Sequence, residues 1–176
     1  MSKADSTKID PIDIHRIRAA EGWLGLGLPV DARAELAEIS EPNREHPEAL
    51  RVKWEVLASL EEWDDAYQTA LLIIQNSARD PSGWIHRAYA ARRMTGGSLE
   101  RAFKALYPAV ELFPNEPVIP YNLACYCCQM NRLPESRIWL QRTLRISSEP
   151  RASAAIKQMA LADKDLTAMW EEIKLL

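Results

Sequence analysis

The sequence predicts an all-α protein, an α-α superhelix of about four helix pairs. Apolar residues recur three and four positions apart, which is the spacing of one helix face. A pattern of small and apolar residues also repeats about every 34 residues, as in solenoid proteins. The 176 residues include only six glycines and two phenylalanines, which disfavours a sheet-rich fold or an enzyme built on glycine-rich loops.

Each copy of the repeat has a small residue followed by apolar residues four and seven positions later. The second copy begins 34 residues after the first, the third after 36 more and the fourth after another 34. The two extra residues fall in a predicted turn at 95–98. Prolines, which suit the first turn of a helix, mark three unit starts. The small residues are Ala32, Ala66, Ala102 and Ser136, and the prolines are Pro47, Pro81 and Pro117.

Short connections require the two helices of each unit to be antiparallel. Pro108 lies inside a predicted helix and should kink it. Residues 1–12 are expected to be loose, and 151–176 to form capping helices at 151–162 and 165–174. The units are expected at 13–46, 47–80, 81–116 and 117–150, with helices at 13–26, 29–40, 47–60, 63–77, 81–94, 98–113, 117–131 and 134–146.

The segment PYNLACYCCQMNRLPESRIWLQRTL at 120–144 shows the repeat most clearly. It has an aromatic-Asn-Leu-small pattern in its first helix and a Glu-small-x-x-x-Leu pattern in its second. This resembles the tetratricopeptide repeat (TPR), and the resemblance covers residues 13–150. It implies close helix approach at positions 8 and 20 of each unit, where small residues stand: Ala20, Ala88 and Ala124, then Ala32, Ala66, Ala102 and Ser136.

Two further features bear on the resemblance. The second unit departs from it, because position 8 is Trp54, and Ala70 at the usually large position 24 suggests a compensating exchange of volumes. The tail at 160–173 is similar to the ending of small bacterial TPR proteins of unassigned activity. Its apolar residues form one stripe of a capping helix, at Leu166, Met169, Trp170 and Ile173.

The resemblance implies a non-enzymatic protein-interaction module or scaffold. Its first helices would line a concave groove that binds a peptide or a segment of a partner protein. Aromatic and arginine side chains would anchor the ligand, since these dominate most interfaces. The groove residues carried over from the family positions are Arg51, Glu55, His86, Tyr89, Arg92, Arg93, Tyr121, Asn122, Cys125 and Gln129.

The three cysteines, Cys125, Cys127 and Cys128, stand close together on one predicted helix. At such spacing at most two could bind one metal ion, so packing is the favoured interpretation. No catalytic residue, cofactor or metal is expected, because no catalytic or metal-binding motif is present. A redox or thiol-dependent role of the cysteine cluster remains as an alternative from another class.

The net charge of −3 gives no argument for nucleic-acid binding. No apolar run is long enough to span a membrane, and the polar N-terminus does not resemble a signal peptide. Together with the odd number of cysteines, this predicts a cytoplasmic protein. Two alternatives stay open: a small bacterial TPR chaperone for an exported or assembling partner, and self-association through the groove or the C-terminal helix.

Overall fold

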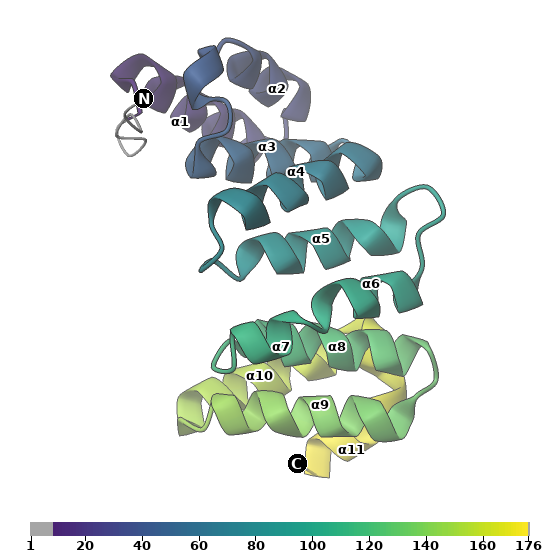
Figure 1. Cartoon of the computed structure of the whole chain (residues 1–176). Helices are drawn as coiled ribbons and strands as arrows, with labels where there is room; N and C mark the ends of the chain where they lie inside the picture. The colour runs from purple at the N-terminus through teal and green to yellow at the C-terminus, as the bar shows by residue number, and fades with distance from the viewer. Residues whose placement is uncertain (1–8, 176) are drawn as a thin grey trace. The chain divides into compact units, whose positions relative to one another are not determined.

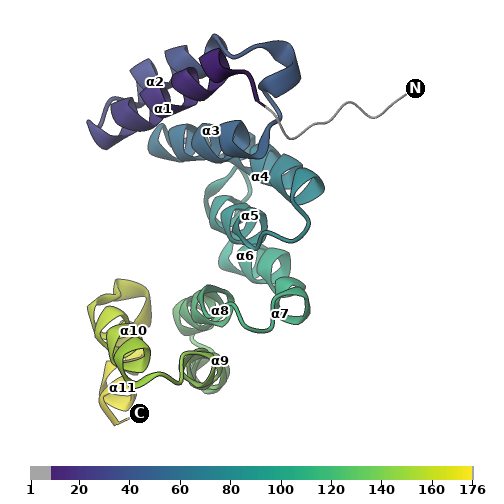
Figure 2. The same ribbon diagram turned by 90° about the vertical axis from the view of Figure 1, so that its left-hand side faces the viewer.

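The computed structural model describes residues 9–175, and among these residues the secondary structure is entirely helical (Figures 1 and 2). Eleven α-helices and two 3₁₀ helices follow one another within this range. They are α1 (Pro11–Gly25), α2 (Pro29–Ala37), η1 (Glu41–Asn43), α3 (Pro47–Ser59), α4 (Trp63–Asn76), α5 (Ser82–Arg93), α6 (Leu99–Leu106), α7 (Ala109–Leu112), α8 (Val118–Gln129), α9 (Leu133–Ile146), α10 (Pro150–Ala162), η2 (Lys164–Met169) and α11 (Trp170–Leu175).

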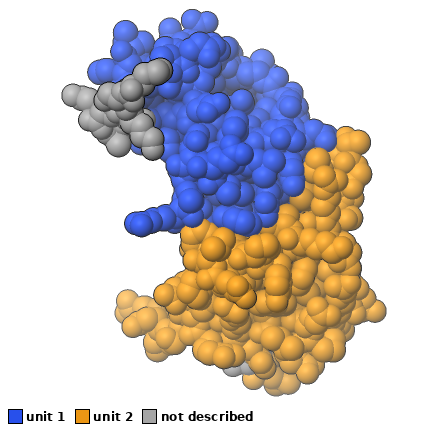
Figure 3. Space-filling model, in the orientation of Figure 1, with its two compact units in different colours: residues 1–90 blue, residues 91–176 orange. Residues whose placement is uncertain are grey.

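The chain divides into two compact units, residues 1–90 and 91–176, which Figure 3 colours blue and orange. The division falls inside α5, so that Tyr89 belongs to the first unit and Arg92 to the second. Each unit has a core of its own. In the first unit, one core cluster includes Ile17 and Val56 and another includes Leu50 and Ile73; in the second unit, a cluster surrounds Leu166.

Three of the turns between paired helices repeat one geometry. Gly27, Glu61 and Asn131 each follow the last turn of a helix in the left-handed conformation, with φ of 74°, 58° and 60°. In each turn the next N–H reaches back to a carbonyl five residues earlier, the Schellman arrangement, at 2.9, 2.9 and 2.8 Å. The repeat in the sequence is therefore also a repeat of backbone conformation.

The turn after α5 holds the extra residues. Gly96 takes the left-handed conformation there, and the N–H of Ser98 reaches back seven residues to the carbonyl of Ala91 at 3.2 Å. A Cβ on Gly97 would lie only 2.7 Å from the carbonyl oxygen of Met94, so this position requires glycine. Ser98 then caps α6 by accepting the N–H of Arg101.

Small residues are fully buried at every position where the resemblance implies close helix approach. Ser136 keeps its hydroxyl paired there by donating to the carbonyl of Ala124 at 2.9 Å. Trp54 replaces the small residue in the second unit of the repeat. It packs in the same cluster as Ala70, which is consistent with the expected exchange of volumes.

The structure corrects three details at helix ends. Residues 1–8 of the expected loose segment lie outside the described residues, but residues 9–12 are ordered. Ile9 is buried, and α1 begins at Pro11 because Asp10 accepts the N–H of Ile12. The kink expected at Pro108 is a break between α6 and α7. The helix expected at 165–174 is a 3₁₀ turn, η2, followed by α11.

Two glycine substitutions test the repeated turn geometry. Gly25 ends α1 with helical backbone and Gly27 is left-handed, and an added Cβ would meet no atom within 4 Å at either position. Gly25→Ala should therefore raise the free energy of unfolding by about 0.5 kcal/mol. Gly27→Ala should lower it by about 1 kcal/mol, because an L-residue is disfavoured there. Urea denaturation of both variants measures this, and effects of equal sign would contradict the assignment of the turn.

Candidate functional site

The residues expected to line a groove fall into two groups, one in each compact unit. In the first unit, α3 and α5 carry Arg51, Glu55, His86 and Tyr89. In the second unit, α5 and α8 carry Arg92, Arg93, Tyr121, Asn122, Cys125 and Gln129.

Arg51 is part of a small ion-pair network in the first unit. Its guanidinium contacts Glu21 of α1 and donates to Glu55, one turn further along α3, at 2.9 Å. All three side chains are about two-fifths exposed, so these pairs add little stability. They do hold the arginine in place, with its charge balanced by two carboxylates.

His86 lies flat against Trp54, with ring centroids 3.9 Å apart and an angle of 7° between the planes. Tyr89 meets the edge of Trp54 at 6.0 Å and lies 5.8 Å from Trp63. Tyr89 is still 40% exposed, so one rigid aromatic edge remains at the surface. Trp54 was predicted to be a packing residue, and the stack on His86 could not be read from the sequence.

Burial lowers the pKa of His86 from 6.5 to about 4, and the positive charge of Arg51 acts in the same direction, while Asp80 opposes both. The imidazole is therefore neutral at pH 7. Its Nδ1 and the indole Nε1 of Trp54 are buried atoms without a hydrogen-bond partner among the described residues. The first unit thus presents an aromatic surface rather than a cationic one at this point.

The α8 face of the second unit is covered by the chain's own C-terminal residues. Tyr121 donates its hydroxyl to Asp163 at 2.9 Å, and the side chain of Gln129 donates to the backbone carbonyl of Asp165 at 3.1 Å. Arg92 holds the carboxylate of Asp165 with both terminal nitrogens, one of them at 3.2 Å. The thiol of Cys125 also contacts Asp163, with its Sγ 3.6 Å from Oδ2. Four of the residues expected to bind a partner therefore bind residues 163–165 of the same chain.

Apolar contacts complete this cover. Leu166, Met169 and Ile173 are buried against Tyr121 and Cys125 of α8. Trp170 packs at the margin of this cluster, and its indole N–H donates to the carbonyls of Ala160 at 3.1 Å and Asp163 at 3.3 Å. The predicted apolar stripe exists, but its docking position on the α8 groove face was not predicted.

Arg137 of α9 is exposed at the surface, and its guanidinium pairs there with Glu172 of α11, at 2.5 and 2.6 Å. This second arginine–carboxylate contact also fixes the C-terminal residues.

Beyond the covered part of α8 lies an open apolar pocket of about 240 Å³. Val118 of α8 and Met159 of α10 line it and are 44% and 49% exposed. Asn122 also lines it, with its amide N–H donated to the carbonyl of Val118 one turn earlier at 3.0 Å. The remaining walls come from Pro117, Tyr121, Thr143 and Ile156. Of the expected groove residues in this unit, Asn122 is thus beside open space, while Arg93 is half-buried on α5.

The three cysteines are buried thiols. Desolvation raises the pKa of each, that of Cys127 to about 11, and Asp163 adds to the effect at Cys125. A thiolate, the form that reacts with oxidants and binds metals, is disfavoured at all three positions. Within residues 9–175 no three His, Cys, Asp or Glu side chains are grouped as a metal site.

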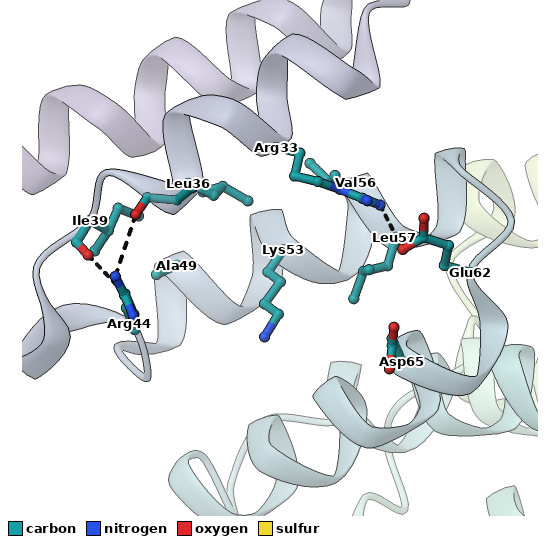
Figure 4. Close-up of a pocket in the computed structure, with 11 residues that line it drawn as sticks. Arg33, Leu36, Ile39, Arg44, Ala49, Lys53, Val56, Leu57, Glu62 and Asp65 are labelled. Atoms are coloured by element: carbon teal, nitrogen blue, oxygen red, sulfur yellow. Dashed lines mark hydrogen bonds and ion pairs between the residues drawn. The ribbon is translucent and has the colours of Figure 1, made fainter.

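A pocket of about 440 Å³ in the first unit was missed by the sequence analysis (Figure 4). It lies between α2, α3 and α4, with an apolar floor and charged margins. Arg33 pairs with Glu62 at 2.6 Å, and Arg44 donates to the carbonyl of Ile39 at 3.0 Å, so two of its cations are already engaged. Its lining residues are Arg33, Leu36, Ala37, Ile39, Arg44, Ala49, Lys53, Val56, Leu57, Glu62 and Asp65.

The lowered pKa of His86 makes stability depend on pH. The unfolded chain takes up a proton on His86 near pH 6.5, but the folded chain does so only near pH 4. The contribution of His86 to the free energy of unfolding is therefore complete above pH 6.5 and is lost as the pH falls towards 4. Between pH 7 and 4.5 the loss should be about 2.5 kcal/mol. The variant His86→Phe keeps a ring against Trp54 but has no group that titrates, so this part of the loss of stability should be absent in it. Guanidinium denaturation at both pH values measures it, and equal losses in the two proteins would contradict the assignment.

Within residues 9–175, no helix combines the length and the apolar character that a membrane crossing needs. No family model matches the chain, and no curated protein matches it by sequence.

Two solved structures are similar. The RS-1 ArsTM double mutant of MamA has a TM-score of 0.66 at 15% identity, covering 78% of this chain and 78% of that chain. A thermophilic TPR protein of Thermus thermophilus has a TM-score of 0.65 at 18% identity, covering 93% of this chain and all of that chain. Identities this low show likeness of fold alone. The chain therefore has a TPR-like, α-α superhelical fold.

Proposed function

We propose that the chain is a protein-interaction module, and that it binds an apolar side chain of a partner segment in the pocket between α8, α9 and α10. The observation that carries the proposal is the open pocket of about 240 Å³ with Val118 and Met159 exposed at its margin. Exposed apolar groups that line a concavity are typical of a docking site. The amide of Asn122 at the same margin offers a polar group to a partner's backbone.

The aromatic edge in the first unit is a second proposed contact surface of the same function. Tyr89 is held between Trp54 and Trp63, so little conformational entropy remains to be lost when a partner covers it. Arg51 and Glu55 lie on the neighbouring helix α3 and would contribute at the rim. Arg92 has no place in this proposal, because it is engaged by Asp165.

Binding is favoured over thiol chemistry because burial keeps the three cysteines protonated.

Selection from a random peptide library against the full chain tests the pocket. Val118→Asp and Met159→Asp should each weaken the selected peptides at least about tenfold, because a charge would then face an apolar side chain. Leu112→Asp is the matched control, since Leu112 is exposed on α7 and does not line the pocket. Fluorescence anisotropy with labelled peptides measures all three.

The proposal fails if no peptide is enriched, or if Leu112→Asp weakens binding as much as the pocket variants do. Peptides that respond to Tyr89→Ala but to neither pocket variant would place the binding surface on the first unit instead.

A further inference from the structure

The C-terminal arm, defined as α10, η2 and α11 (residues 150–175), is fixed to the rest of its unit by its far end. Among the thirteen residues of α10, all of them described, Ala160 alone is buried. The pocket beside Val118 separates part of α10 from α8 and α9. Figure 2 shows α10 and α11 lying together. The helix that leads into the arm therefore acts mainly as a tether, and η2 and α11 make the contacts that hold it.

The link before the arm is short and held locally. Three residues, 147–149, join Ile146 at the end of α9 to Pro150 at the start of α10. The N–H of Ser147 bonds within α9, to the carbonyl of Thr143 at 3.0 Å, and Glu149 has non-helical backbone angles, with φ of −56° and ψ of 127°. A change of backbone angles at this link would redirect α10 without altering the core around Leu140. A few residues of this kind are sufficient for a hinge.

The α8 face and the arm recognise each other through a specific polar pattern. The face offers the side-chain donors of Tyr121, Cys125 and Gln129 on α8, together with Arg92 on α5. The arm supplies the carboxylate of Asp163 and both the carboxylate and the carbonyl of Asp165. Leu166 and Met169 then fill the apolar part of the face. This segment is the one sequence that the structure shows to fit the face, and every copy of the chain carries it.

We propose that the arm exchanges between two copies of this chain, so that the α8 face of each copy holds residues 163–173 of the other. Each interaction that breaks when an arm leaves its own face forms again on the second copy. The balance between closed monomer and exchanged dimer is then set by the hinge and by protein concentration. An unrelated partner segment would leave the displaced arm without a face, whereas reciprocal exchange gives both arms a face again, which favours a second copy as the occupant.

Two full-length variants with reversed charges test the exchange. Arg92→Glu reverses the charge on the face and leaves the arm unchanged. Asp165→Arg reverses the charge on the arm and leaves the face unchanged. Alone, each variant sets like charges against each other at this contact. In a mixed dimer, the unchanged Asp165 meets the unchanged Arg92 at one face, and the two reversed charges attract at the other. Native mass spectrometry of an equimolar mixture, with one variant isotopically labelled, should show mixed dimers at least about tenfold above either same-variant dimer.

The matched control reverses an ion pair of the same unit outside the arm, Arg132 with Glu100. A mixture of Arg132→Glu and Glu100→Arg should give no enrichment of mixed dimers. Circular dichroism checks the fold of each variant. If a variant does not fold, labelled and unlabelled wild-type chains are mixed over a concentration series, and mixed dimers that increase with concentration are expected.

Exchange is overturned if the variant mixture stays monomeric, or, in the wild-type series, if no mixed dimer appears at any concentration; the arm is then a permanent cap of its own chain. It is also overturned if a free peptide of residues 160–175 binds the Asp165→Arg chain while no mixed dimer forms. That result would show that the face binds this segment when it is added as a separate peptide, but that the chains do not exchange their arms.

Discussion

Helix α8 is apolar on nearly every side, and this constraint governs the second unit. Nine of its twelve residues are buried, among them Ala124, whose carbonyl accepts the hydroxyl of Ser136 of α9, and Tyr121, which packs with the C-terminal residues. A helix of this kind needs cover all round, because each exposed apolar side chain would cost about 1.5–3 kcal/mol. Helix α9 covers one side and the C-terminal arm covers the other. The arm is therefore part of the core of this unit and not an appendage to it.

Covering α8 in this way changes what its groove face can do. In a repeat array this face is where a ligand is expected, and here residues 163–165 already satisfy Arg92, Tyr121 and Gln129. The segment that this face binds is a short acidic turn followed by apolar residues. What remains open is the pocket beside Asn122, and on the first unit the aromatic edge at Tyr89. A partner protein would bind at those two places, whereas the covered face would take part only in the exchange of arms.

Local spacing was sufficient to predict the helices, because periodicity and turn residues act over a few positions. The turns at Gly27 and Asn131 and the close contact at Ser136 follow from that pattern. The contact between Arg92 and Asp165 could not be predicted from the local pattern. Asp165 lies 73 residues away, and nothing in the spacing of either helix links the two residues. The same holds for the stack of Trp54 on His86, which joins two different helix pairs. The apolar character of α8 was visible in the sequence, and so was the apolar stripe of the predicted capping helix that covers its second face.

The arm is held on α8 by recognition of its carboxylates as well as by apolar burial. A double-mutant cycle of Arg92→Gln and Asp165→Asn, measured as the free energy of unfolding, tests this most directly. Because both side chains are less than a third exposed and bonded to each other, we expect a coupling energy of about 1 kcal/mol or more. Effects that add within about 0.3 kcal/mol would contradict it, and would leave the arm as a purely apolar cap.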